Sequence, residues 1–88
     1  MPGVARVGAD TAGGVQLPGG NVTVRANGLP AQVLAGPVAG HGDSPHGSPS
    51  MVRASSTVRA SGIPICRLGD PASCGHPSTG SPDVSAGG

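Results

Sequence analysis

The fifteen residues from Thr57 to Pro71 read TVRASGIPICRLGDP, and a closely similar stretch occurs once more in the chain. That first copy, from Thr23 to Pro37, reads TVRANGLPAQVLAGP and lies 34 positions earlier. Eight of the fifteen aligned pairs are identical, which chance does not readily produce in a chain of 88 residues. The sequence is therefore predicted to be built from a repeated unit.

Each copy is predicted to form a strand, a two-residue turn and a second strand. Asn27-Gly28 stands at the centre of the first copy, and Ser61-Gly62 takes its place in the second. An Asn-Gly pair between two apolar segments is the strongest short signal for a two-residue hairpin turn, and Ser-Gly is a relative of it. Two β-hairpins are therefore expected.

A third copy is divided between the two ends of the chain. Residues 81–88 (SPDVSAGG) resemble the first strand and turn of the repeat, and residues 4–8 (VARVG) resemble its second strand. The two ends are therefore expected to pair, and three hairpins around one axis would give pseudo-threefold symmetry within a single chain. Such closure also removes the free sheet edges that a small β protein must otherwise protect.

The composition is that of one small β domain, residues 1–88, with a thin core. No Phe, Tyr or Trp is present, and valine leads the remaining apolar residues, which favours strands. The 17 Gly and 10 Pro would suggest disorder if the sequence had no period, but a period is present. A chain with so little core is expected to need a bound metal or a partner for stability.

The charge balance argues against nucleic acid as a partner. Five Arg, no Lys and four Asp give a net charge of +1, so no basic patch is predicted, and no aromatic ring is available to stack on bases. The chain also has no apolar run typical of a secretory signal or a membrane-spanning helix. It is therefore expected to be made and folded in the cytoplasm, with export depending on another carrier.

All three histidines and one of the two cysteines lie in two of the connectors between hairpins. The second connector, about residues 36–50, holds His41 and His46, and the third, about residues 69–80, holds Cys74 and His76. Three imidazoles and one thiolate form a tetrahedral zinc set, and a metal that joins two long connectors would stabilise a thin core. We therefore predict one bound zinc ion, with iron as the second candidate because imidazole binds both.

Two other interpretations of these side chains stay open. His41 and His46 could be solvated loop residues beside prolines, and Cys74 with His76 could be a nucleophile and its base. Four protein ligands would leave a metal no open position for water, and the sequence offers no aromatic or sizeable apolar groups to line a substrate pocket. The chain is therefore not expected to be an enzyme.

The remaining connector and the second cysteine are expected to have structural roles. The first connector, about residues 9–20, contains no His or Cys and is predicted to be a loop outside the metal site. Cys66 lies in a predicted strand, and its partner in the repeat is Gln32, so it is expected to be a strand residue rather than a ligand. A reducing compartment argues against a disulfide between Cys66 and Cys74.

Together these features resemble those of PAAR-repeat proteins, the small conical tips of contractile injection machines. The namesake tetrapeptide of that family corresponds to PAQV at residues 30–33 and PICR at residues 64–67, with a looser PGVAR at residues 2–6. The Val-Gly-Asp-Pro-like exit from these strands corresponds to LGDP at residues 68–71 and, less closely, VGAD at residues 7–10. The resemblance covers essentially the whole chain.

This resemblance implies an all-β fold, a small conical structure of three pseudo-threefold-related hairpins with a metal site near its apex. In such proteins three histidines and one cysteine bind a zinc ion, and here His41, His46, Cys74 and His76 would supply them. The implied partner is a trimeric β-helical spike protein, which carries one tip per trimer.

The implied function is that of a structural tip that caps and sharpens the spike and helps it pierce the target envelope. The machine would be a type VI secretion system, a phage tail or an extracellular injection particle. The tip would be assembled in the cytoplasm and carried to the target on contraction, touching the envelope without inserting stably. The alternative is a generic small zinc-stabilised protein-binding module or effector adaptor.

Overall fold

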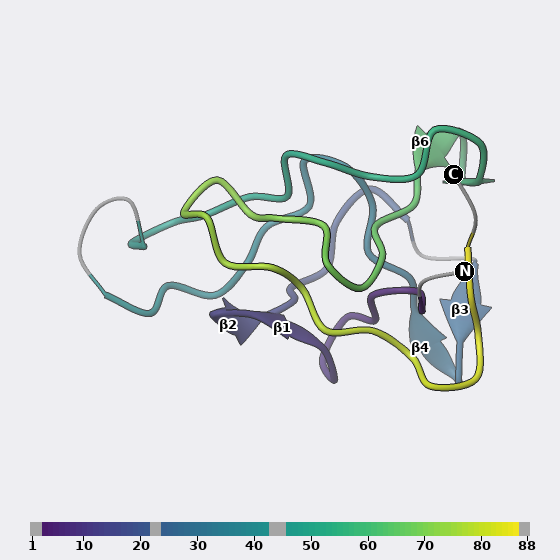
Figure 1. The fold of residues 1–88 in the computed structure, drawn as a ribbon, viewed down its shortest axis with the longest axis horizontal. Helices are drawn as coiled ribbons and strands as arrows, with labels where there is room; N and C mark the ends of the chain where they lie inside the picture. The colour runs from purple at the N-terminus through teal and green to yellow at the C-terminus, as the bar shows by residue number, and fades with distance from the viewer. Residues whose placement is uncertain (1–2, 22–23, 43–45, 87–88) are drawn as a thin grey trace.

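A computed structural model describes residues 3–21, 24–42 and 46–86 of the chain. Within these residues the secondary structure consists of short strands and contains no helix, so the all-β prediction is confirmed. The strands pair in order as three two-stranded antiparallel sheets, β1 with β2, β3 with β4 and β5 with β6 (Figure 1). Their bounds are β1 Thr11–Ala12, β2 Gly14–Val15, β3 Arg25–Ala26, β4 Leu29–Pro30, β5 Arg59–Ala60 and β6 Ile63–Pro64.

The two hairpins predicted from the repeat are present. Asn27 and Gly28 join β3 to β4 with φ angles of 54° and 80°, and Ser61 and Gly62 join β5 to β6 with 53° and 79°. Positive φ at both central residues is the mark of a type I′ turn, whose twist matches that of the flanking strands. The Asn-Gly and Ser-Gly signals are thus confirmed as hairpin turns.

The first connector differs from the prediction, because it is not a plain loop. Thr11 pairs with Val15 and Ala12 with Gly14, so β1 and β2 form a third tight hairpin around Gly13. Gly13 has a φ of 86°, a conformation that residues other than glycine adopt at a cost. Strands of two residues are too short to produce an alternating pattern, so no periodic signal in the sequence indicates this hairpin.

The two ends of the described chain pair with each other, as predicted. Gly3 and Ser85 form an antiparallel bridge, and the Val4 N–H donates to the Val84 carbonyl at 2.7 Å. In Figure 1 the first and last described residues both lie at the end of the molecule that carries β3 and β6. The chain is therefore closed by contacts between its first and last segments.

Three strand-like segments pair with one another at the centre of the molecule, and they are residues 4–6, 31–33 and 65–67. The N–H of Ala5 donates to the Cys66 carbonyl at 3.0 Å, that of Cys66 to Gln32 at 2.8 Å, and that of Gln32 to Ala5 at 2.8 Å. Each of these residues thus donates to one neighbour and accepts from the other. We call this arrangement the closed ring.

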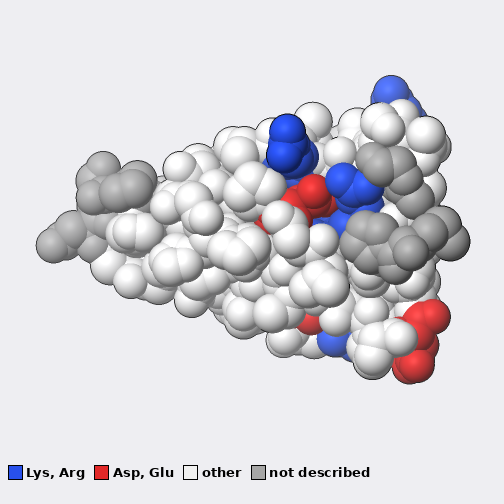
Figure 2. Space-filling model, viewed as in Figure 1, with Lys and Arg blue, Asp and Glu red and all other residues white. Residues whose placement is uncertain are grey.

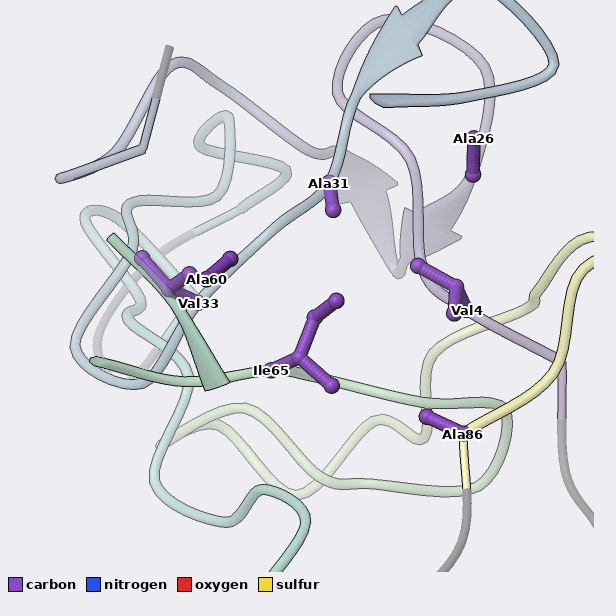
Figure 3. Close-up of a cluster of buried hydrophobic side chains, with 7 residues drawn as sticks. All are labelled: Val4, Ala26, Ala31, Val33, Ala60, Ile65 and Ala86. Carbon is purple, nitrogen blue, oxygen red and sulfur yellow. The ribbon is translucent and has the colours of Figure 1, made fainter. Parts of the chain in front are cut away.

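Two apolar clusters lie against the closed ring, and successive ring residues belong to different ones because neighbouring strand side chains alternate in direction. Ile65 belongs to the first cluster and Cys66 to the second, and both are buried. The first cluster, drawn in Figure 3, contains Val4, Ala26, Ala31, Val33, Ala60, Ile65 and Ala86. The second cluster contains Ala5, Ala12, Val38, Met51, Cys66 and Ala72.

Buried amide side chains join the connectors beside the second cluster. The Gln32 Nε2 donates to the Gln16 Oε1 at 3.0 Å and to the carbonyls of Leu17 at 2.8 Å and Pro37 at 3.0 Å. The Gln16 Nε2 in turn donates to the Ser78 Oγ at 2.9 Å. Because both glutamine side chains are fully buried, these bonds are needed to offset the loss of water.

Two arginine–aspartate pairs hold the exits of the first and third ring segments. The Arg6 Nε lies 2.7 Å from the Asp10 Oδ2 and the Arg67 Nε lies 3.0 Å from the Asp70 Oδ2. In both pairs the same carboxylate oxygen also accepts the backbone N–H of the arginine, at 2.8 Å. These aspartates belong to the VGAD and LGDP motifs, so the motifs close a local turn by charge-assisted hydrogen bonds.

In the second ring segment a glutamine, rather than an aspartate, accepts the corresponding backbone N–H. Gly36 takes the place of Asp70 in the repeat, and the Gln32 Oε1 accepts the Val33 N–H at 3.1 Å. A Cβ on Gly36 would collide with that Gln32 oxygen. Gln32 therefore requires a residue without a side chain at position 36.

The outline of the molecule narrows from one end to the other. Figure 2 shows a broad end, where β3 to β6 lie in the same view of Figure 1, and a narrow end opposite it. The principal extents are 31, 23 and 22 Å. On the face shown, the charged side chains of the described residues gather in the broad half, and none of them is seen in the narrow half (Figure 2). The part of the chain that is described contains no helix long and apolar enough to cross a membrane.

Deletion of residues 81–88 tests the closure of the chain by its ends. The deletion removes the partner of Val4 and the buried Ala86, and burial is worth about 25 cal/mol per Å² of apolar surface. We expect a loss of a few kcal/mol, a large share of the stability of so small a domain, and hence an insoluble or unfolded chain. Urea unfolding and solubility measure this loss, with deletion of residues 87–88 alone as the control. Normal stability after the longer deletion would contradict the closure.

The Arg6–Asp10 pair predicts a defined dependence of stability on pH. Burial raises the pKa of Asp10, but hydrogen bonds from Arg6 and Thr79 outweigh that effect and leave the pKa below its ordinary value. The carboxylate therefore contributes stability above its unfolded pKa of about 3.9, and this contribution disappears as the pH falls through the lower folded pKa.

Replacement of Asp10 by Asn should accordingly cost about 2 kcal/mol at neutral pH, and the difference from the native chain should shrink below about pH 4. Denaturant unfolding of the chelator-treated proteins across pH measures the difference without a contribution from bound metal. Asp83→Asn, at an exposed carboxylate, is the control and should have little effect. A penalty for Asp10→Asn that stays constant down to pH 2 would contradict the assignment.

Candidate metal centre

The four predicted ligands lie together. One ligand atom from each of His41, His46, Cys74 and His76 lies within 4.8 Å of all the others. His41 and His46 come from the second connector, and Cys74 and His76 come from the third. The group therefore joins two segments that are more than twenty residues apart in the sequence.

Two of the distances within the group match those of a tetrahedral metal site. The His46 Nδ1 lies 3.2 Å from the His41 Nε2, and the Cys74 Sγ lies 3.6 Å from the same nitrogen. Bonds of about 2.0–2.1 Å to nitrogen and 2.3 Å to sulfur place neighbouring ligand atoms about 3.3 Å (N–N) and 3.6 Å (N–S) apart in a tetrahedron. The three imidazole centroids are also nearly equidistant, at 5.0, 5.0 and 5.1 Å. The group could therefore hold a metal ion.

The tautomer of His41 is fixed by a backbone carbonyl. Its Nδ1 lies 3.0 Å from the Ala39 oxygen, which can only accept, so the Nδ1 carries the proton. In the neutral ring the Nε2 then carries a lone pair rather than a proton, and it is this atom that faces His46 and Cys74. A metal-binding histidine commonly has its other ring nitrogen held in this way.

Cys74 and His76 are placed by a tight turn. Gly75 separates them with a φ of 93°, and its N–H donates to the Ala72 carbonyl at 2.9 Å. The Ala72 N–H donates to the His76 carbonyl, also at 2.9 Å. The short Cys-x-His spacing thus lies on a reversal of the chain that brings both side chains to the group.

A closed loop places His41 and His46. The His41 N–H donates to the His46 carbonyl at 2.9 Å, which brings the two ends of the intervening segment together. The backbones of Gly40 and Gly47 lie in close contact, since a Cβ on Gly40 would collide with the Gly47 oxygen. The absence of a side chain at Gly40 therefore allows the two sides of this loop to approach closely enough for the histidines to meet.

The first connector contributes a residue that the sequence analysis placed outside the site. The turn of the β1–β2 hairpin lies against the ligands, since a Cβ on Gly13 would collide with the His41 Nε2 and lie 2.6 Å from the His76 Cδ2. The connector contains no His or Cys, so its side chains did not indicate a contact with the metal site. The Gly13-Gly14 pair was the available signal.

Cys66 lies outside the group, in agreement with its predicted structural role. Its side chain is fully buried in the second apolar cluster, and its Sγ lies 3.7 Å from the Arg53 carbonyl. Burial raises the pKa of the Cys66 thiol to about 12, so the reactive thiolate form is disfavoured at neutral pH. Both Cys66 and Cys74 are free thiols.

The arrangement could support metal binding, or thiol chemistry that uses only Cys74 and one imidazole. The Cys74 Sγ lies 3.6 Å from the His41 Nε2, so the thiol has an imidazole neighbour other than His76, with which the catalytic interpretation paired it. A thiol with a neighbouring imidazole is the minimum for a nucleophile and base. Metal binding, in contrast, engages all four side chains at once and accounts for their mutual distances.

Comparisons with known proteins add no further constraint. A scan of the chain against models of known protein families gave no match, and a search of curated proteins found no similar sequence. Function is therefore inferred from the repeat, the fold and the geometry of the ligand group.

The group predicts one metal ion per chain in protein purified without chelator. Cys74→Ser or His76→Ala should abolish binding, because each removes one of four ligands. Cys66→Ser should retain the metal, because its sulfur lies outside the group and faces Arg53 instead. Elemental analysis by mass spectrometry gives the ratio. A ratio near zero for the native chain, or loss of metal in Cys66→Ser alone, would contradict the assignment.

Proposed function

We propose that this chain is a PAAR-like spike tip, a small cone of three pseudo-threefold-related hairpins that caps a trimeric β-helical spike protein of a contractile injection machine. The observation that carries the proposal is the closed ring formed by Ala5, Gln32 and Cys66. Three segments in equivalent positions give one chain three similar sides. A true trimer could therefore contact each side with one of its subunits.

The equivalence extends from the ring to the segments around it. The first residue of each ring segment, Val4, Ala31 or Ile65, donates its N–H to the carbonyl of a valine, at 2.7, 3.0 and 3.0 Å. These valines are Val84, Val24 and Val58 respectively. A polar side chain three residues before each valine, Ser81, Asn21 or Ser55, accepts the N–H of that valine at 3.0, 3.0 and 2.9 Å. The same local structure is thus repeated three times, and the third copy uses the two ends of the chain.

The broad end is the proposed docking surface for the spike. Val24 and Val84, at equivalent positions near this end, are 40% and 36% exposed. Arg25 and Arg59 are also exposed, and each donates a guanidinium hydrogen bond to the carbonyl of its own hairpin turn, at 3.1 and 3.3 Å. Exposed apolar groups beside oriented cations suit a partner end that offers apolar side chains and carboxylates.

The metal is proposed to be zinc, with iron as the second candidate, and its role is structural. The second and third connectors have few large apolar side chains to pack against each other. A metal held by His41, His46, Cys74 and His76 would join them, and the free energy of metal binding would contribute directly to folding. The proposed mechanism is therefore mechanical, in that a metal-stiffened narrow end leads the spike into the target envelope.

A generic zinc-stabilised binding module or effector adaptor is the alternative. The observation that favours it is the exposure of two further apolar side chains. Val52 and Leu68 are 55% and 53% exposed, and exposed apolar groups can mark a contact with another protein. Such a module would bind a partner by its flank and would have no need for threefold equivalence.

The tip proposal predicts a complex of one chain with three copies of a β-helical spike subunit. Native mass spectrometry of the co-expressed proteins measures the ratio. Val24→Asp should weaken this complex strongly, because it buries a charge at the broad end, whereas Leu68→Asp makes the same change on the flank and should leave it intact. A one-to-one complex, specific binding to nucleic acid, or the reverse order of the two variants would contradict the proposal.

A further inference from the structure

We propose that the β1–β2 hairpin, which supplies no ligand, forms the third wall of the metal centre, and that Gly13 is a positioning residue for His41 and His76. This inference rests on the proposed metal-binding role of the centre and not on the identity of the partner. The hairpin acts on the ligands through two independent sets of contacts. One set fixes the tautomer of a histidine, and the other limits the space around two rings.

The first set of contacts runs through the backbone of Ala39. The Ala39 N–H donates to the carbonyl of Val15 in β2 at 2.9 Å, and the Ala39 carbonyl accepts from the His41 Nδ1 at 3.0 Å. Strand β2 therefore fixes Ala39, and Ala39 in turn fixes the ring of His41. Since the proton on the Nδ1 leaves the Nε2 as the ligand atom, the hairpin decides which nitrogen of His41 faces the metal.

The second set of contacts is made by the glycines of the turn. Gly13 has no room for a Cβ, which would collide with the His41 Nε2 and lie 2.6 Å from the His76 Cδ2. Gly14 is equally restricted, because a Cβ there would collide with the Ala39 oxygen and lie 2.9 Å from the His41 Nδ1. The backbone of the turn thus lies directly against the two imidazoles that the second and third connectors supply.

The consequence is that Gly13, which has no side chain to bind a metal, controls the geometry of the centre. The second and third connectors supply the ligands, and the first connector supplies a wall. His41 and His76 are therefore confined to the orientation in which their nitrogens converge. Any side chain at position 13 must push one of the rings away. Metal affinity is therefore expected to depend on Gly13 although Gly13 coordinates nothing.

The chain offers matched controls for this effect. Gly13, Gly28 and Gly69 have φ angles of 86°, 80° and 90°, so alanine at each position incurs a similar backbone penalty. A Cβ on Gly28 or Gly69 meets nothing within 4 Å. The comparison of Gly13→Ala with Gly69→Ala and Gly28→Ala therefore separates contact with the rings from backbone strain.

The experiment is competition of zinc between a chromophoric chelator and the full-length variants. Gly13→Ala is expected to weaken zinc binding by about tenfold or more, as loss of a supporting contact does in other metal sites, and to change the visible spectrum of the cobalt-substituted protein. Gly69→Ala and Gly28→Ala should stay near the native affinity. Equal affinities of Gly13→Ala and Gly69→Ala, whether both normal or both weak, would overturn the positioning role.

A second measurement needs no variant and covers the case in which Gly13→Ala does not fold. In the zinc-loaded native chain, NMR should give cross-relaxation between the Gly13 α protons and the rings of both His41 and His76, together with a proton on the His41 Nδ1. Absence of these contacts, or coordination of the metal by the His41 Nδ1, would overturn the inference. A native chain that bound no metal would instead overturn the proposed metal centre itself.

Discussion

Three backbone hydrogen bonds, from Ala5 to Cys66, from Cys66 to Gln32 and from Gln32 to Ala5, hold together a chain that has no Phe, Tyr or Trp side chain. The buried apolar residues that the structure describes are valines and alanines with Met51, Ile65 and Cys66, and such a core cannot specify a fold by shape in the way that aromatic residues do. The closed ring specifies it instead, because each segment satisfies the polar groups of the next and no sheet edge is left open at the centre. The apolar clusters, the buried amides and the arginine–aspartate pairs are all arranged on this frame.

The features that the sequence predicted well are those that depend on local chemistry. The hairpin turns follow from Asn27-Gly28 and Ser61-Gly62, because few residue pairs accept positive φ at two successive positions. The meeting of the four ligands follows from the repeat, which brings two connectors to the same end. The β1–β2 hairpin and its contact with the ligands could not be predicted in this way, because they depend on Gly13 fitting against rings that lie far away in the sequence.

The three equivalent positions of the ring show how a repeat can diverge without losing its backbone. Ala5, Gln32 and Cys66 have side chains of different size and polarity, yet their main-chain hydrogen bonds are the same. Gln32 provides for its segment what Asp10 and Asp70 provide for the others, an oxygen that accepts a main-chain N–H at the exit of the strand. No residue-by-residue comparison would have matched an amide inside the strand with a carboxylate beyond it.

The pairing of the first described segment with the last also constrains how the domain folds. Val4 pairs with Arg67 and is bonded to Val84, so these partners lie far from it in the sequence. Such long-range pairing delays folding, since the entropy of closing a long loop must be overcome before the contact offsets it. Glycine, proline and short apolar runs give other chains little to bind while this pairing is incomplete. The scarcity of large apolar groups that weakens the folded core thus also lowers the tendency of the unfolded chain to aggregate.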